Sequence, residues 1–140
     1  MAKTIRDVMT RDPISYPEST SLADAARAMR DRDTGDVLVE KDGSICGIAT
    51  DRDIVVRAVA EGRDPAQMTL GEICSHEVTT VSPDDSVESA VELMREKALR
   101  RLPVCDENGH AIGIVSLGDL AVDRDPSSAL ADISAAPPNN

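Results

Sequence analysis

Two copies of a hydroxyl and a carboxylate, three residues apart, follow apolar runs in this sequence. "GIATDRD" spans residues 47–53 and "GIVSLGD" spans residues 113–119, which is 66 positions later (113 − 47). The pairs are Thr50 with Asp53 and Ser116 with Asp119. A carboxylate accepts charge-assisted hydrogen bonds from two neighbouring hydroxyl groups, and a side-chain hydroxyl donates or accepts as needed. The pattern therefore offers two sites for a polyhydroxylated ligand.

The same spacing also suits a purely structural role. In a capping box, a hydroxyl and a carboxylate three residues later bind each other's backbone N–H groups at the start of a helix. Both copies need the same helix start, so the duplication does not decide between the roles. The local sequence favours the structural role, and ligand binding needs support from the wider sequence.

The whole chain is an imperfect internal repeat. Thr4–Met9 matches Thr69–Cys74 at an offset of 65 (69 − 4), and one extra residue in the second copy raises the offset to 66. We expect a first module, a linker, a second module and a disordered tail at residues 4–62, 63–69, 70–124 and 125–140. The tail is small, polar and punctuated by proline, which is typical of disorder.

Each module is predicted to contain a strand, a helix, two strands and a helix, which makes the fold class α/β (α+β). Ile14–Tyr16 and Val78–Val81 are the predicted first strands. Apolar stripes with helical spacing follow: Leu22, Ala25, Ala26 and Met29 in one copy, and Val87, Ala90, Val91 and Met94 in the other. Asp42-Gly43 and Asn108-Gly109 indicate hairpin turns. The second helix of the first copy has the predicted apolar face Ile54, Val55, Ala58 and Val59, and it ends near Gly62.

Composition narrows the function. The net charge of −11 repels polyanions such as DNA and anionic membranes. Tyr16 is the only aromatic residue, so platforms for stacking bases are almost absent. No apolar run reaches the roughly 20 residues of a membrane span, and the start lacks a signal peptide's apolar stretch. We expect a soluble, cytoplasmic protein that binds neither nucleic acid nor membrane.

The order and duplication of these motifs resemble the CBS domain, a family named after cystathionine β-synthase whose members occur in tandem pairs. The matching segments are "IRDVMT", "SLADAARAM", "GSICGIATDRDI" and "LRRLPVCDENGHAIGIVSLGDL". The resemblance covers residues 4 to about 124 and implies two βαββα modules packed as a pseudo-twofold pair. It also implies two clefts between the modules that bind adenosine-containing ligands in many members, and pairing into homodimers.

The resemblance assigns roles to particular residues. Thr50 with Asp53, and Ser116 with Asp119, would hold ribose at the N-terminal ends of helices, where free N–H groups also favour phosphate. The family tends to place a basic residue before the "LPV" strand, facing the phosphates, and here that is Arg100-Arg101. The adenine walls are expected to be Ile14, Val37 and Ile48 in one cleft and Thr79, Leu102 and Ile114 in the other.

The two clefts are predicted to be unequal. Gly35-Asp36 stands where the second copy has Arg100-Arg101, and an aspartate that faces a cleft repels phosphate. Arg52 is another candidate for binding phosphate, or an exposed salt-bridge partner of little energetic value. The sequence does not say which hydroxyl–carboxylate pair shares a cleft with the two arginines.

Catalysis and metal binding find little support in the sequence. The two histidines stand in no recognisable catalytic context, so we expect no enzyme. Cys74, His76 and Glu77 supply three ligand types in one short stretch, but a zinc site usually needs a second ligand pair, and we predict no metal. Cys46 and Cys105 lie in apolar strands and are expected to be reduced core thiols.

The sequence therefore predicts a stand-alone regulatory or sensor module without a required cofactor. It would bind AMP, ADP, ATP, NAD or S-adenosylmethionine, form a homodimer and act on another protein, because no enzyme or transporter domain is attached. One alternative is a structural or stress-associated dimer that has lost ligand binding, which Asp36 favours. Another is a redox- or metal-responsive protein that uses Cys74, Cys105 and His76. The sequence identifies neither the ligand nor the downstream partner, nor whether one or both clefts fill.

Overall fold

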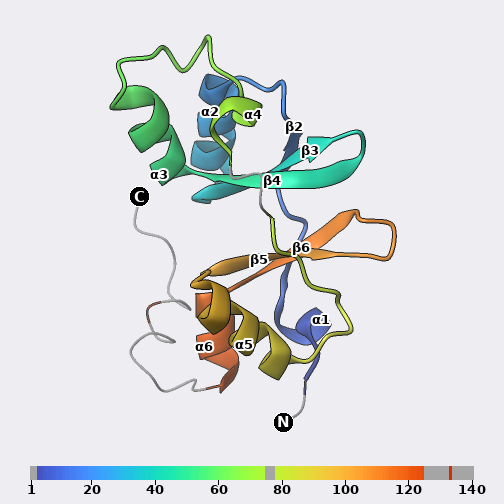
Figure 1. Ribbon diagram of the computed structural model, residues 1–140. Helices are drawn as coiled ribbons and strands as arrows, with labels where there is room; N and C mark the ends of the chain where they lie inside the picture. The colour runs from blue at the N-terminus through green and yellow to red at the C-terminus, as the bar shows by residue number, and fades with distance from the viewer. Residues whose placement is uncertain (1–2, 75–77, 125–132, 134–140) are drawn as a thin grey trace. The chain divides into compact units, whose positions relative to one another are not determined.

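The chain folds into two compact units that do not follow the order of the repeat. A computed structural model describes residues 3–74, 78–124 and 133. Residues 14–78 form one unit, here called the central unit, and residues 1–13 join residues 79–139 in the other, here called the terminal unit. Both combine a three-stranded sheet with helices (Figure 1). The predicted α/β (α+β) class is confirmed, with one small sheet in each unit.

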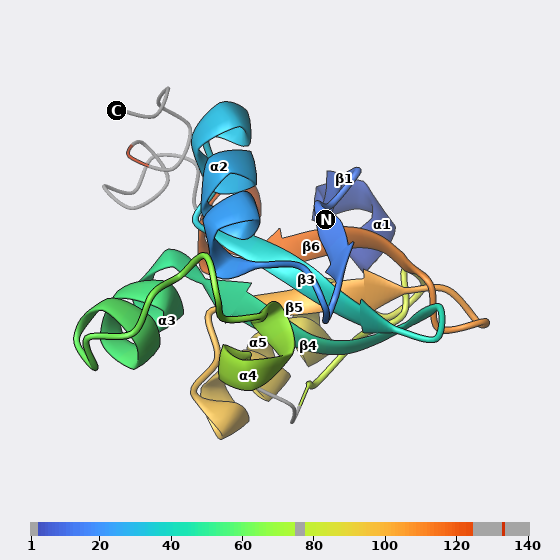
Figure 2. The ribbon, with the colours of Figure 1, turned by 90° about the horizontal axis from the view of Figure 1, so that it is seen from above.

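The central unit contains the sheet β2-β3-β4, in which β2 (Ser15–Pro17) is parallel to β3 (Asp36–Lys41) and β3 is antiparallel to β4 (Ser44–Thr50). Helix α2 (Leu22–Arg32) crosses β3 (Figure 2). The remaining helices are α3 (Asp51–Ile54), its π-helical continuation η1 (Val55–Val59) and α4 (Leu70–Ile73). Leu22, Ala25 and Met29 of α2 are buried together with strand residues in one core cluster.

The terminal unit contains the antiparallel sheet β1-β6-β5, formed by β1 (Thr10–Arg11), β6 (Ala111–Ser116) and β5 (Arg101–Cys105). Its helices are α1 (Ile5–Val8), α5 (Val87–Lys97) and α6 (Leu117–Arg124). Pro103 lies in β5 at the edge of this sheet, where a residue without an N–H group is tolerated.

The segment that opens the first repeat packs with the second. β1 pairs with β6 at Thr10–Ile114 and Arg11–Gly113. A Cβ atom on Gly113 would lie 2.7 Å from Met9 Sδ and 2.9 Å from the Thr10 carbonyl oxygen, so only glycine permits this approach. The glycine of the second motif is thus a packing requirement. The expected module of residues 4–62 describes the repeat, whereas the compact units divide the chain at residues 13 and 78.

Most of the predicted local signals are found. The capping boxes at Thr4 and Thr69 begin α1 and α4, and both hairpin turns form with positive φ at Gly43 and Gly109. Gly62 also has positive φ and ends the helical segment. The predicted linker contributes to the core, because Met68 is buried and its carbonyl accepts a bond from Leu22 N.

Three predictions of local structure are wrong. Val78–Val81 forms no strand in the terminal unit and makes only a single parallel bridge from Val81 to Val104. Ala26 is exposed on α2. Val55 and Val59 are 56% and 57% exposed, because the helix switches to π-type bonding, with Ala60 N donating to Val55 O, and buries only Ile54 and Ala58 of the predicted face.

Candidate functional site

The second copy of the motif begins helix α6 as a capping box. Asp119 N donates to Ser116 Oγ at 3.1 Å, and Ser116 N donates to Asp119 Oδ2 at 2.9 Å. The structural role of these two side chains is therefore real. The cap uses only one of the two carboxylate oxygens of Asp119, and each oxygen can accept more than one hydrogen bond.

The second oxygen of Asp119 contacts the N-terminal arm. Thr10 Oγ1 donates to Asp119 Oδ1 at 3.4 Å, a long and weak bond between an exposed strand and the start of α6. The sequence gives no signal for this contact, since the two residues are 109 positions apart. Asp119 Oδ1 keeps capacity for a ligand hydroxyl.

The two arginines lie beside this pair. In the β5–β6 ladder, Arg101 is directly opposite Ser116, and Leu117 N donates to Arg100 O at 2.9 Å, which joins the end of β6 to the residue before β5. A pocket of about 420 Å³ results, within the volume range of small-molecule sites. Its lining comprises Arg100, Arg101, Ser116, Leu117, Gly118, Asp119 and Val122.

The pocket shows which hydroxyl–carboxylate pair lies beside the two arginines. Arg100 and Arg101 lie in the terminal unit together with Ser116 and Asp119. Two guanidinium groups next to the start of α6, where the helix dipole is positive, form an environment that favours an anion. Sequence reasoning did not name Leu117, Gly118 and Val122 as pocket-lining residues, although their positions shortly after Ser116 could have indicated them.

The first copy of the motif builds the same cap in the central unit. Thr50 N donates to Asp53 Oδ2 at 2.9 Å and Asp53 N donates to Thr50 Oγ1 at 3.1 Å. Here the other carboxylate oxygen faces Arg57, whose Nε lies 3.8 Å from Asp53 Oδ1. Arg57 also donates from Nη1 to Ile73 O at 2.5 Å, and so connects this helix to α4.

The charge around the first copy is reversed. Asp36 lies opposite Thr50 in the β3–β4 ladder, at the position that Arg101 takes in the terminal unit. Asp51 follows Thr50, and its N–H donates to Gly35 O at 2.9 Å. Arg52 is exposed beside these carboxylates. Asp36 on β3 and Asp51 and Asp53 at the start of α3 place three carboxylates near this helix start. Their negative charge disfavours binding of a phosphate.

The predicted wall residues divide into two groups. Val37 and Leu102 have no exposed surface and pack in the cores of their units, so we remove them from the candidate site. Four others are partly exposed, and their role as walls stays a prediction: Ile14, Ile48, Thr79 and Ile114.

The three thiols are free, and each has a raised pKa. Burial is the main cause at Cys46, Cys74 and Cys105, with nearby negative charge as a smaller cause. Among residues 3–74 and 78–124, no group of three His, Cys, Asp or Glu side chains is placed to hold a metal ion. His76 and Glu77, which the metal hypothesis needs, lie outside the described residues.

A regular pair of small α/β modules with duplicated helix starts defines the class of protein, a tandem regulatory module. The sequence profile of the CBS domain matches twice, over residues 5–59 and 70–122, and this chain belongs to that family. No helix in the described part of the chain is long and apolar enough to cross a membrane.

Known relatives agree with this assignment. The CBS domain-containing protein YhcV of Bacillus subtilis (strain 168) is 37% identical over 135 residues, covering 94% of this chain and 95% of its own. The crystal structure of Hypoxic Response Protein I with two coordinated zinc ions shares 34% identity and a TM-score of 0.74, covering 86% of this chain and 98% of its own. A protein of that name occurs in Mycobacterium tuberculosis.

A more distant structure shows the same fold with ligands present. It is the CBS domain pair of protein MJ0100 in complex with 5′-methylthioadenosine and S-adenosyl-L-methionine. The TM-score is 0.80 at 22% identity, covering 91% of this chain and all of that one (100%). At this identity the match supports the fold alone.

Proposed function

We propose that the terminal-unit pocket binds the ribose and phosphate of an adenosine-containing ligand, and that the protein acts as a cytoplasmic regulatory module through this binding. AMP, ADP, ATP and NAD carry the phosphate that Arg100 and Arg101 favour, whereas S-adenosylmethionine carries none. The observation on which the proposal rests is the convergence of both arginines with Ser116 and Asp119 on one pocket of about 420 Å³. A CBS pair of the same fold is known in complex with adenosine compounds.

The residues divide the work of binding. Asp119 Oδ1 accepts from the ribose hydroxyls while Asp119 Oδ2 keeps the cap. Arg100 and Arg101 donate to phosphate oxygens as charge-assisted bonds, the stronger kind of hydrogen bond in proteins. The ligand binds one arrangement of the chain more tightly than the others and so stabilises that arrangement, which a partner protein recognises. We also propose that the chain self-associates.

The test uses the near absence of aromatic residues. With Tyr16 as the sole aromatic, a co-purified purine dominates the ultraviolet spectrum near 260 nm. A thermal-shift panel then compares AMP, ADP, ATP, NAD and S-adenosylmethionine. A ligand at a hundred times its Kd adds about 2.7 kcal/mol to the unfolding free energy, which raises Tm by several degrees. Arg101→Ala lowers the shift with the phosphorylated compounds, while Asp36→Ala at the equivalent position of the central unit retains it.

A second candidate is a structural protein without a nucleotide ligand. It is favoured by the capping bonds, which use one oxygen of both Asp53 and Asp119. No shift with any of the five compounds, together with a spectrum free of a 260 nm maximum, would leave this candidate in place and refute the first.

A further inference from the structure

The two copies of the motif differ in charge at the position four residues after the carboxylate. Arg57 holds this position in the central unit, and Asp123 holds it in the terminal unit (123 − 66 = 57). Residues four apart on a helix are neighbours on its surface, so this side chain can interact with the motif carboxylate that precedes it. An arginine attracts that carboxylate, whereas an aspartate repels it.

Arg57 occupies the carboxylate of the first copy. Its Nε atom lies 3.8 Å from Asp53 Oδ1, the oxygen that the capping bond does not use, and the Asp53 side chain is only 19% exposed. Arg57 Nη1 also donates to the carbonyl oxygen of Ile73 at 2.5 Å, so the guanidinium group is held at two points. A positive charge fixed beside Asp53 Oδ1 competes with the hydroxyl groups of a ligand for this oxygen.

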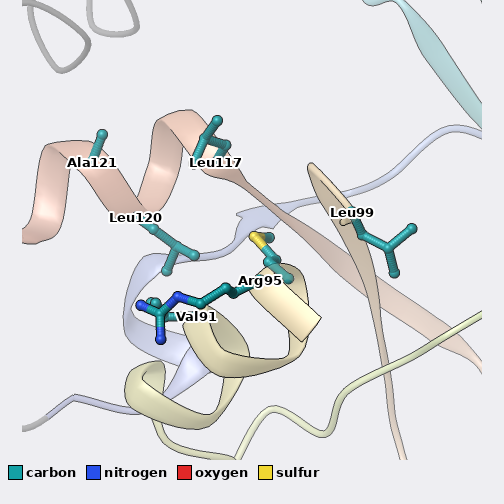
Figure 3. A pocket seen from close by; sticks show the side chains of 7 residues that line it. Val91, Arg95, Leu99, Leu117, Leu120 and Ala121 are labelled. Atoms are coloured by element: carbon teal, nitrogen blue, oxygen red, sulfur yellow. The ribbon is translucent and has the colours of Figure 1, made fainter. Parts of the chain in front are cut away.

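Asp123 interacts with the N-terminal arm instead. Lys3 Nζ lies 2.7 Å from Asp123 Oδ1, and the Asp123 side chain is only 12% exposed. The packing of α6 agrees with this direction, because Leu120 points from α6 toward Val91 and Arg95 on α5 (Figure 3) and is 4% exposed. The ion pair with Lys3 neutralises Asp123. This helix position therefore brings no cation to the motif carboxylate of the terminal unit.

The carboxylate of the second copy is easier for a ligand to reach. Asp119 Oδ1 accepts from Thr10 Oγ1 at 3.4 Å, a long bond between exposed groups that a ligand hydroxyl can replace. The cations beside Asp119 are Arg100 and Arg101, which line the same pocket from the edge of the sheet. They favour an anionic ligand in that pocket, whereas the guanidinium group in the central unit is tied to a backbone carbonyl.

We propose that the residue four positions after the carboxylate decides which copy of the motif accepts a ligand. Arg57 blocks the first copy, and Asp123 leaves the second copy accessible, so one chain binds one adenosine-type ligand. This inference rests on the proposed function. It adds the stoichiometry of binding and names the residue that sets it.

Isothermal titration with adenosine tests the proposal. Adenosine carries no phosphate, so the negative charges of Asp36 and Asp51 do not repel it. The wild type binds one adenosine per chain. Arg57→Gln removes the charge, retains an N–H donor and binds two. Asp123→Arg places a guanidinium group four residues after Asp119 and lowers the affinity of the terminal-unit pocket at least tenfold.

Matched controls separate these effects from a general change of charge. Arg27→Gln breaks another arginine–aspartate ion pair on a helix of the central unit, that with Asp24, and still binds one adenosine. Lys3→Gln breaks the ion pair with Asp123 without adding a cation near the motif carboxylate, and its affinity stays within twofold of that of the wild type. Circular dichroism confirms that each variant is folded.

Three binding results would overturn the proposal: two adenosines per wild-type chain, one adenosine per chain of Arg57→Gln, or wild-type affinity in Asp123→Arg. A double-mutant cycle in urea, with Arg57→Gln and Asp53→Asn, tests the ion pair without a ligand, and an absence of coupling also refutes the inference.

Failure of the proposed function gives a different result. A wild type that binds no adenosine compound refutes the proposed pocket. A gain of one adenosine by Arg57→Gln in that case still supports the inference, whereas no binding by any variant refutes both.

Discussion

Arg101 and Ser116 face each other as direct partners in the antiparallel β5–β6 ladder. Because side chains on directly opposite residues lie on the same face of a sheet, this register places a guanidinium group beside the hydroxyl that caps α6. The equivalent pair in the central unit is Asp36 and Thr50. One ladder position therefore gives the two units opposite charge at the same helix start.

Removal of the Arg101 guanidinium should weaken binding of phosphorylated ligands specifically. A hydrogen bond to a charged group contributes about 1.5–3 kcal/mol, so Arg101→Ala should lose at least tenfold in affinity for AMP. Affinity for adenosine, which has no phosphate, should change little. Isothermal titration with both ligands measures the difference, and an equal loss for AMP and adenosine would place Arg101 away from the phosphate.

Asp119→Ala should affect both stability and binding. Loss of the cap costs about 0.5–2 kcal/mol of unfolding free energy. Asp53→Ala removes the matching cap in the central unit and should cost a similar amount. Urea denaturation measures both. If ligand affinity falls for Asp119→Ala and is unchanged for Asp53→Ala, the terminal-unit carboxylate contacts the ligand; equal affinity in both variants contradicts that role.

Gly113→Ala should destabilise the terminal unit by about 1–3 kcal/mol, because its Cβ would overlap Met9 and the Thr10 carbonyl. Hydrogen exchange should show lost protection at β1 before other strands. Gly35→Ala is the control, since its Cβ would meet only the Asp51 carboxylate at 3.2 Å, which can move aside. An equal cost for the two variants would argue against the tight approach of β1.

Ala98→Gly should stabilise the protein by about 1 kcal/mol. Ala98 ends α5 in the left-handed region, with φ of 54°, where a Cβ is unfavourable and glycine is preferred. The equivalent residue that ends α2, Asp33, has φ of 51°, and Asp tolerates this region better than Ala. Asp33→Gly should therefore gain less in a thermal melt, and a loss of stability in Ala98→Gly would contradict the strain argument.

Stability should fall at both ends of the pH range. The hydrogen bond from the Thr69 backbone lowers the pKa of Glu72 below its ordinary value of 4.5. The contribution of Glu72 to the unfolding free energy is therefore present above pH 4.5 and is lost as pH falls through the folded pKa. Burial raises the pKa of Cys74 above 9.0, so its contribution is full below pH 9.0 and is lost as pH rises through the folded pKa. In urea denaturation, Glu72→Gln should lose less unfolding free energy at low pH than the wild type does, and Cys74→Ala should lose less at high pH. A loss equal to that of the wild type would contradict these assignments.

Sequence reasoning predicted the parts of the fold that depend on neighbouring residues. Capping boxes at Thr4, Thr50 and Thr69 and turns at Gly43 and Gly109 each follow from a few adjacent side chains and backbone angles. Their duplication supported the tandem architecture, which the match of the family profile confirms. The exposure of Val55 and Val59 was not predictable in this way, because a helical periodicity assumes α-type bonding throughout.

The sequence by itself determined that two copies of one α/β unit exist, that each begins a helix with a hydroxyl and a carboxylate, and that only the second copy has arginines at its sheet edge. Only the tertiary structure decided that Arg100 and Arg101 share a pocket with Ser116 and Asp119, and that the N-terminal arm packs on β6. The physical reason is the separation along the sequence between the residues that interact. Caps and turns are set by interactions within about four residues, whereas strand register and the packing of an arm on a distant strand depend on contacts across the chain.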